Sequence, residues 1–268
     1  MRARPGDHGD RYYDQTPAAA ARYDRLHAGQ LDDVRFYVEE ARREPGPILE
    51  AGCGTGRITL SIAEAGVGAV GLDRSPHMLA VAEAKRRAAP APVRSRCAFV
   101  RADLRRFAFR HPFAQVFLPF RVFQALLTVE DQLAALASIR GALGPGGRLV
   151  FNVFDPRADL LAGDGAPGRV RESGREYEDS GTRVRERYVA RYDRVEQLLD
   201  LTFLYEREAP ANGAERVFEP LRLRYFHRFE IEHLLARAGY EVEALYGDWQ
   251  RGPFVENGQE MIWVARRA

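Results

Sequence analysis

Three closely spaced glycines follow a short apolar run in the stretch ILEAGCGTGR, residues 48–57. Gly52, Gly54 and Gly56 leave backbone N–H groups uncovered where a strand passes into a helix, so a polar ligand can approach closely there. A dinucleotide-binding loop also requires glycine at the sixth position counted from Gly52, and that position is Arg57. The spacing therefore disfavours a nicotinamide-dependent oxidoreductase.

Acidic residues stand at the ends of three successive apolar runs. Glu50 precedes the glycines, and Asp73 and Asp103 end the next two runs. Because the carboxyl ends of parallel strands meet at one edge of a sheet, we expect these acids to border one site. The Asp73 carboxylate can accept hydrogen bonds from two ribose hydroxyls. With no lysine or arginine fixed among the acids by the motif, this pattern suits a cofactor with an adenosine part and no phosphate.

The elements that hold these residues alternate between short apolar runs and amphipathic stretches, which predicts an α/β fold with a parallel sheet and helices on both faces. Strands are predicted at residues 48–50, 69–73, 98–102, 114–119, 148–154, 241–246 and 261–265. Helices are predicted at residues 56–65, from Ser75 onward, at 129–143 and at 229–238. Ahead of the sheet, residues 18–41 are expected to be helical, in two pieces around Gly29.

A different pattern follows the fifth predicted strand. Three runs with period-two alternation, at 183–192, 197–206 and 216–227, predict an antiparallel insert with one apolar, aromatic face. We therefore expect a helical arm over residues 1–46, a main domain over 47–156 and 229–268, and the insert over 157–228. The insert is expected to be a substrate lid or a dimer contact, and its aromatic side chains could alternatively form a small core of its own.

Composition narrows the classes of partner. The 268-residue chain has 40 basic and 38 acidic residues, and a net charge of +2 supplies little general attraction for nucleic acid. No run of about 18 apolar residues is present, so we expect no membrane span and a cytoplasmic location. Cys53, Cys97 and the scattered histidines have no metal-ligand spacing, so no metal site is expected.

Four motifs, in this order, resemble those of the class I S-adenosylmethionine-dependent methyltransferases. They are ILEAGCGTGR, VGLDRSPHML, VRADLRRF and LGPGGRLVFNVF, and the resemblance covers roughly residues 10–155 and the last two strands. It implies a Rossmann-like seven-stranded sheet with S-adenosyl-L-methionine as cofactor. The sequence departs from the family at Ala114, where the fourth strand usually opens with an acid, so no catalytic base is expected there.

The resemblance also implies roles for individual residues. The backbone of Gly52 and Gly54 would pass under the methionine part of the cofactor, Glu50 would order its amino group, and Asp73 would hold the ribose hydroxyls. The remaining cofactor contacts would come from the adenine side, from the loop after the fourth strand and from N-terminal tyrosines: Arg74, Met78, Asp103, Leu104, Phe120, Tyr12 and Tyr13. Tyr23 is a further tyrosine of the same N-terminal region.

The methyl acceptor is expected over the same sheet edge, beside the loop LPFRVFQAL that follows the fourth strand. Candidate acceptor-binding residues come from this loop and from the aromatic face of the insert: Arg121, Gln124, Tyr188, Tyr205, Tyr225 and His227. His227 is a candidate general base because imidazole titrates near neutral pH, and Tyr13 is the second catalytic candidate. Plain packing is the alternative role for the aromatic members of this set.

We therefore expect a methyltransferase that acts on a nitrogen or oxygen atom of a small molecule by in-line transfer, because the insert can build a lid over such an acceptor. Two alternatives stay open. One is a protein that binds the cofactor without catalysis or serves as an inactive partner in a hetero-oligomer. The other is a methyltransferase that acts on tRNA or on a protein.

Overall fold

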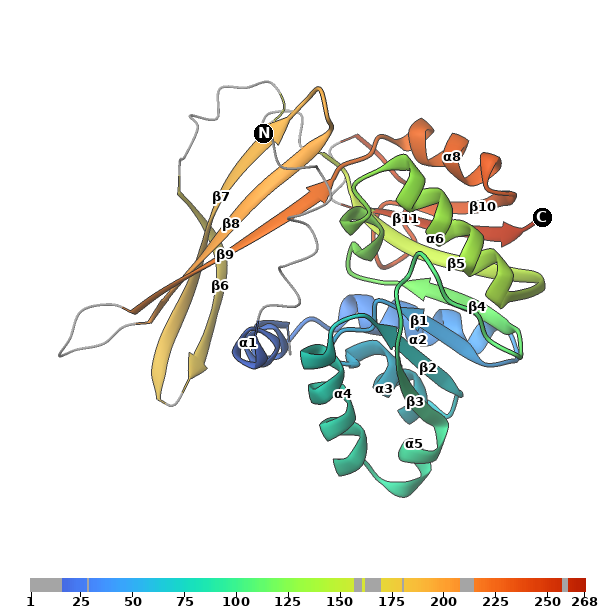
Figure 1. The fold of residues 1–268 in the computed structure, drawn as a ribbon, viewed down its shortest axis with the longest axis horizontal. Coiled ribbons are helices and arrows are strands. Elements are labelled where there is room, and N and C mark those ends of the chain that lie inside the picture. Colours follow the sequence, from blue (N-terminus) through green and yellow to red (C-terminus); the bar gives the residue numbers. More distant parts are fainter. Residues whose placement is uncertain are drawn as a thin grey trace.

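The chain forms two β-sheets, one of seven strands and one of four (Figure 1). The computed structural model describes residues 16–27, 29–156, 161, 170–179, 181–207, 215–256 and 260–268. The larger sheet has the strand order β10-β11-β5-β4-β1-β2-β3, and the smaller has the order β6-β7-β8-β9. The predicted residues Tyr12 and Tyr13 lie outside the described residues.

The larger sheet is parallel at its centre and antiparallel at one side. Its parallel strands are β1 (Ile48–Ala51), β2 (Ala69–Asp73), β3 (Cys97–Arg101), β4 (Phe113–Leu118) and β5 (Leu143–Phe154). β11 (Glu260–Arg267) pairs antiparallel with β5, and β10 (Tyr240–Tyr246) pairs antiparallel with β11. This arrangement confirms the predicted Rossmann-like α/β fold with a seven-stranded sheet.

Helices cover both faces of this sheet because its central strands are apolar on both sides. Ile48 belongs to a buried cluster with Phe36 of α2 (Asp32–Arg43) and Ile58 of α3 (Arg57–Glu64). The next residue, Leu49, belongs to the opposite cluster, which includes side chains of α6 (Val129–Ala142) and α8 (Arg228–Arg237). Alternate residues of one strand thus enter two cores, which explains the continuous apolar runs in the sequence.

Two further helices connect β2 to β3 along the chain. α4 (Pro76–Ala88) begins at Ser75, whose hydroxyl accepts a hydrogen bond from the backbone N–H of Met78 at 3.3 Å, and α5 (Ala91–Arg96) follows it. The N-terminal helical segment is broken between α1 (Pro17–His27) and α2, as predicted. Among the described helices, none combines the length and the apolar character needed to cross a membrane.

The insert has four described strands instead of the predicted three. They are β6 (Arg171–Asp179), β7 (Thr182–Asp193), β8 (Leu198–Arg207) and β9 (Glu215–Arg224), paired antiparallel in this order. The sequence of β6, RESGREYED, has no apolar alternation, and the strand forms through its backbone pairing with β7 at the edge of the sheet. Charged residues are frequent on edge strands, which explains why the alternation pattern missed it.

The helix α1 lies between the two sheets (Figure 1). On one side Arg22 forms an ion pair with Glu219 of β9, and its guanidinium lies 4.8 Å from the centre of the Tyr205 ring in β8. On the other side Asp24 accepts hydrogen bonds at 2.7 Å from the Thr55 hydroxyl in the glycine loop and from Lys85 of α4. One helix therefore connects the insert to the glycine loop.

Candidate functional site

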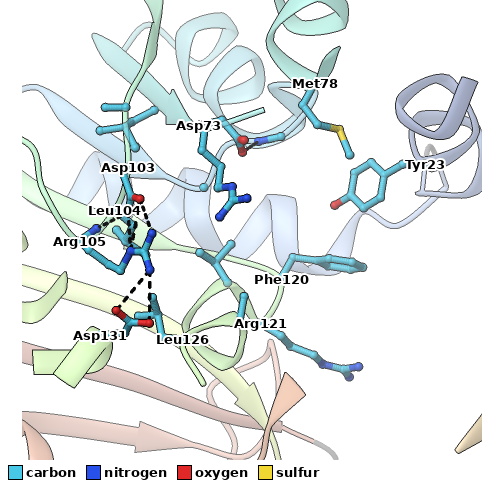
Figure 2. Close-up of a pocket in the computed structure, with 17 residues that line it drawn as sticks. Tyr23, Asp73, Met78, Asp103, Leu104, Arg105, Phe120, Arg121, Leu126 and Asp131 are labelled. Atoms are coloured by element: carbon cyan, nitrogen blue, oxygen red, sulfur yellow. Dashed lines mark hydrogen bonds and ion pairs between the residues drawn. The ribbon is translucent and has the colours of Figure 1, made fainter. Parts of the chain in front are cut away.

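A cavity opens at the carboxyl edge of the parallel strands (Figure 2). Its walls come from the ends of β1, β2 and β3, from the loop after β4, from α1 and from α6. The predicted cofactor-binding residues on its lining are Gly52, Gly54, Asp73, Arg74, Met78, Asp103, Leu104 and Phe120. Arg121, a predicted acceptor-binding residue, lines the same cavity. The topology thus gathers residues from separate motifs around one space.

Two glycines of the loop are required for different reasons. Gly52 has a φ of +83°, and a Cβ there would lie 2.5 Å from Cγ1 of Val122, so the protein itself closes this position. Gly54 has a φ of +53°, and the nearest atom to a Cβ there would be Cε1 of Tyr23 at 4.0 Å. Gly54 therefore borders open space on the cavity lining, whereas Gly52 permits the loop after β4 to pack against the first strand.

The carboxylate of Asp73 is fixed by backbone groups. Its Oδ2 accepts a hydrogen bond from the Gly54 N–H at 2.8 Å, and its Oδ1 accepts one from the Ser75 N–H at 2.8 Å. The residue is 9% exposed and lines the cavity. Each carboxylate oxygen can accept more than one hydrogen bond, so this anchored group can also bind a ligand hydroxyl.

Asp103 is held by an arginine that sequence reasoning did not assign to the site. Its carboxylate accepts hydrogen bonds from Nη2 of Arg105 at 2.6 Å and from the Arg105 backbone N–H at 2.9 Å. Arg105 also reaches both oxygens of Asp131 in α6 at 3.3 Å (Figure 2). The hydrogen bond from Arg105 lowers the pKa of Asp103, against the effect of partial burial. The rim of the cavity therefore carries a hydrogen-bonded triad in which Arg105 joins Asp103 to Asp131.

Glu50 is buried behind the glycine loop. Its Oε2 accepts a hydrogen bond from the Thr59 backbone N–H at 2.7 Å and another from the Thr59 hydroxyl. Burial raises the pKa of Glu50 to about 7, although the hydrogen bonds from Thr59 lower it. Glu50 is 3% exposed and is not on the cavity lining, so its role toward a cofactor amino group stays a prediction.

Tyr23 is the N-terminal tyrosine that reaches the cavity. Its ring centre lies 5.9 Å from that of Phe120 and 4.5 Å from that of His27, and Tyr23 and Phe120 both line the cavity (Figure 2). His27 also contacts Phe120, with ring centres 4.7 Å apart. Burial and, after it, the nearby charge of Arg175 lower the pKa of His27 to about 4, so this imidazole is neutral at physiological pH. Aromatic side chains of α1 thus pack against the loop after β4.

The loop after β4 has an unusual backbone at the cavity. Phe120 and Arg121 have φ values of +55° and +66°, a conformation that costs free energy for residues other than glycine. The guanidinium of Arg57 lies 5.7 Å from the centre of the Phe120 ring, and Arg121 donates a hydrogen bond to Oε1 of Glu260 in β11 at 2.6 Å. These contacts, and the packing of Val122 on Gly52, hold the strained loop in place.

Arg57, the residue that disfavoured a dinucleotide loop, anchors the first helix of the site. Its Nη1 donates hydrogen bonds of 2.8 Å to Oδ1 of Asp33 and to the backbone oxygen of Gln30, and its Nη2 donates to Oδ2 of Asp33 at 2.5 Å. The guanidinium therefore donates hydrogen bonds both to the connection between α1 and α2, at Gln30, and to the start of α2, at Asp33. This arrangement fixes the start of α3 against the N-terminal helices.

Gln124 has a structural position. Its side-chain Nε2 donates to the backbone oxygen of Arg224 at 2.9 Å, and its Oε1 accepts from the backbone N–H of Phe154 at 3.0 Å. The residue is fully buried and is not on the cavity lining. The Gln124 amide therefore joins the end of β5 to the insert through both of its groups. This geometry does not support the predicted contact with the acceptor.

The predicted acceptor-binding residues of the insert are not brought to the cavity. Tyr205 and Tyr225 are buried, Tyr188 is half-buried, and none of these three lines the cavity. His227 is exposed at the N-cap position of α8, where its backbone N–H donates a hydrogen bond to Oε2 of Glu230 at 3.4 Å. This position makes His227 a helix cap, and its predicted role as a base has no support in the geometry.

The described residues contain no group of three or more His, Cys, Asp or Glu side chains arranged to hold a metal ion. Cys53 and Cys97 are both buried free thiols. Burial raises the pKa of the Cys53 thiol well above its ordinary value. This buried thiol is protonated at neutral pH and is a poor nucleophile.

The chain is similar in sequence to known methyltransferases. The family model described as "Methyltransferase domain" matches residues 48–147. The chain is 27% identical over 224 residues to a cypemycin N-terminal methyltransferase from a Streptomyces species, covering 82% of each chain. It is 26% identical over 230 residues to a dTDP-3-amino-3,4,6-trideoxy-alpha-D-glucopyranose N,N-dimethyltransferase from Streptomyces venezuelae, covering 85% of this chain and 90% of that protein.

A solved structure shows the same fold over nearly the whole chain. The CcbJ methyltransferase from Streptomyces caelestis superimposes with a TM-score of 0.80 at 23% identity, covering 96% of this chain and 98% of the other. The likeness therefore includes the insert as well as the domain around the cavity. The family-model match and the methyltransferase relatives support a class I S-adenosylmethionine-dependent methyltransferase, and the solved structure shows the same fold.

Proposed function

We propose that the enzyme transfers the methyl group of S-adenosylmethionine to a nitrogen atom of a small molecule. The observation that carries this proposal is the position of α1, which contributes Tyr23 to the cavity lining and forms an ion pair with the insert through Arg22 and Glu219. We propose that α1 and the insert together enclose a small acceptor. Support for nitrogen comes from the two relatives above, whose names describe N-terminal and N,N-dimethyl transfer.

The residues on the lining suit this cofactor. The cofactor supplies an electrophilic methyl group on a sulfonium. Asp73 is proposed to accept hydrogen bonds from the ribose hydroxyls, since backbone donors already fix its carboxylate. Met78, Leu104 and Leu126 are proposed to contact the adenine, and Gly54 to lie against the methionine part, where no side chain intervenes.

The remaining residues are proposed to position the acceptor and exclude water. Tyr23 and Phe120 form an aromatic rim on the side of the cavity that faces α1. In-line methyl transfer depends mainly on alignment and on a dry site, and a nitrogen nucleophile that is neutral when it reacts needs no base. This agrees with Ala114 in place of the family acid and with the capping role of His227.

The test is a panel of small molecules and macromolecules incubated with S-adenosylmethionine and the purified enzyme. Amino sugars, simple amines, phenols, tRNA and a protein extract are compared by the formation of S-adenosylhomocysteine. We expect turnover with a subset of the amines. Methylation of tRNA or protein in the absence of small-molecule turnover would refute the proposal, and cofactor binding without any turnover would favour the non-catalytic alternative.

A further inference from the structure

The insert sheet presents one face to α1, here called the inner face. It is formed by alternate residues of three strands: Glu186, Tyr188, Ala190 and Tyr192 of β7, Leu199, Leu201, Phe203 and Tyr205 of β8, and Glu219, Leu221 and Leu223 of β9. Residues directly opposite in an antiparallel pair lie on the same face, so these side chains form one surface. Arg22 of α1 contacts this surface at Tyr205 and Glu219.

Two carboxylates interrupt this apolar face. Glu219 is 5% exposed and forms an ion pair with Arg22. Glu186 is 3% exposed, and its Oε1 has no hydrogen-bond partner. The cation that approaches it is Nη1 of Arg175, at 4.0 Å, which is beyond hydrogen-bonding distance. A buried carboxylate oxygen without a hydrogen bond is costly, so Glu186 requires an explanation.

The outer face of the same sheet shows that arginine partners are plentiful. Glu206 is paired with Arg187 at 2.6 Å and with Arg216 at 2.9 Å. Asp200 is paired with Arg191 at 2.7 Å and also with Arg222. These two partly buried carboxylates thus have two arginines each, whereas the more deeply buried Glu186 has an oxygen without a hydrogen bond. Folding requirements do not account for this distribution.

Contacts through α1 and Arg175 link the surroundings of Glu186 to the cofactor cavity. Arg22 and Tyr23 are consecutive in α1; Arg22 contacts the inner face and Tyr23 lines the cavity. Arg175, whose side chain is 38% exposed, interacts with both Glu186 and His27, and His27 contacts the cavity residue Phe120. Glu186 itself does not line the cavity, so an acceptor would have to extend past α1 to reach this carboxylate.

From these contacts we infer that Glu186 binds a protonated amino group of the methyl acceptor. An ammonium group can donate a hydrogen bond to Oε1 of Glu186, which has no hydrogen-bond partner. The group bound there is not the nitrogen that receives the methyl group, because that nitrogen must offer its lone pair to the sulfonium. The acceptor class is therefore a molecule with two basic nitrogens, an inference that rests on the proposed function.

The experiment compares two matched probes, 1,5-diaminopentane and 1-aminopentane, by calorimetric titration into the full-length enzyme loaded with S-adenosylhomocysteine. We expect the diamine to bind at least about tenfold more tightly, the effect of one charge-assisted hydrogen bond. Glu186→Gln should remove this difference. Glu172→Gln, at a carboxylate paired with Arg187 at 2.7 Å and 64% exposed, is the matched control and should retain it.

A second readout separates a binding role from a structural one. If Glu186 awaits a ligand, Glu186→Gln should melt at the same temperature as the wild type or higher, because an unsatisfied buried charge is removed. A lower melting temperature would indicate a structural ion pair with Arg175 and would overturn the inference. Equal binding of the two amines, or a preference that survives Glu186→Gln, would overturn it as well. Failure of the proposed function is seen separately, as wild-type enzyme that forms no S-adenosylhomocysteine with any amine.

Discussion

Two buried carboxylates of the seven-stranded sheet and two carboxylates of the insert are held by different means. In the seven-stranded sheet, Asp73 and Glu50 accept hydrogen bonds from backbone N–H groups at strand and helix ends. In the insert, Asp200 and Glu206 are held by arginine side chains from neighbouring strands. Backbone donors are placed by the fold, whereas side-chain pairs must be matched residue by residue. The positions of Asp73 and Glu50 accordingly follow from the topology of the larger sheet, whereas those of Asp200 and Glu206 depend on the arginines of neighbouring strands.

The strongest test of this contrast is Asp73→Ala. The change leaves the N–H groups of Gly54 and Ser75 without their acceptor and removes the proposed ribose contact. We expect the dissociation constant for S-adenosylmethionine to rise about 100-fold or more, measured by calorimetry. Asp200→Ala, on the outer face of the insert, is the control and should change it by less than about twofold. Equal effects of the two changes would remove the distinction between the sheets.

A second test concerns the packing of Gly52 on Val122. Gly52→Ala adds a Cβ that would lie 2.5 Å from Val122 and forces alanine to adopt a φ of +83°, so we expect the free energy of unfolding to fall by about 2–4 kcal/mol. Gly146→Ala has a φ of +68° with open space around it and should cost about 1 kcal/mol. Urea denaturation of both variants separates the cost of the contact with Val122 from the cost of a positive φ at alanine. Equal decreases in the free energy of unfolding would show that the contact with Val122 is unimportant.

The raised pKa of Glu50 predicts how the free energy of unfolding depends on pH. Because its pKa rises from 4.5 to about 7 on folding, the folded state holds the proton more tightly than the unfolded state. The contribution of Glu50 to the free energy of unfolding is therefore fully present below about pH 4.5. It declines by about 2–3 kcal/mol as the pH rises toward about 7. Glu50→Gln should remove this decline and be more stable than wild type at pH 8. The exposed Glu64→Gln is the control, and a decline that persists in Glu50→Gln would assign it to other groups.

The smallest effect is expected on the outer face of the insert. Burial raises the pKa of Asp200, but hydrogen bonds from Arg222 and Arg191 outweigh it and leave the pKa below its ordinary value. Arg191 is 65% exposed, so Arg191→Gln should lower the free energy of unfolding by less than about 1 kcal/mol. Arg22→Gln, which leaves the buried Glu219 without its cation, should cost more. A larger loss for Arg191→Gln would show that the outer ion pairs stabilise the insert.

The sequence was sufficient to predict the parts of the site that depend on strand ends. Gly52, Gly54, Asp73 and Asp103 line one cavity because topology brings the carboxyl ends of parallel strands together. Glu50 stands at a strand end as well but does not line the cavity, and the roles of all these residues toward the cofactor stay predictions. Arg105 and Asp131 were missed, since their pairing depends on how α6 packs against the end of β3. The distances between elements that such pairs require are not encoded in local spacing.

The insert was predicted only in outline for a related reason. Its apolar alternation gave β7, β8 and β9, but β6 lacks that pattern. Glu186 did carry a signal, because it stands in phase with Val184, Tyr188 and Ala190 at a position where the alternation demands an apolar residue. An acid at such a position marks a buried carboxylate, and its partner can be identified only from the folded chain.

The helix α1 carries residues for both halves at neighbouring positions, Arg22 for the insert and Tyr23 for the cavity. Consecutive helical side chains diverge by about 100° around the axis, which allows one turn to serve two surfaces. An engineer who exchanges the insert for that of another methyltransferase would therefore have to transplant α1 with it. Under the proposed function, the unit of substrate specificity is discontinuous in sequence and begins before the first strand of the larger sheet.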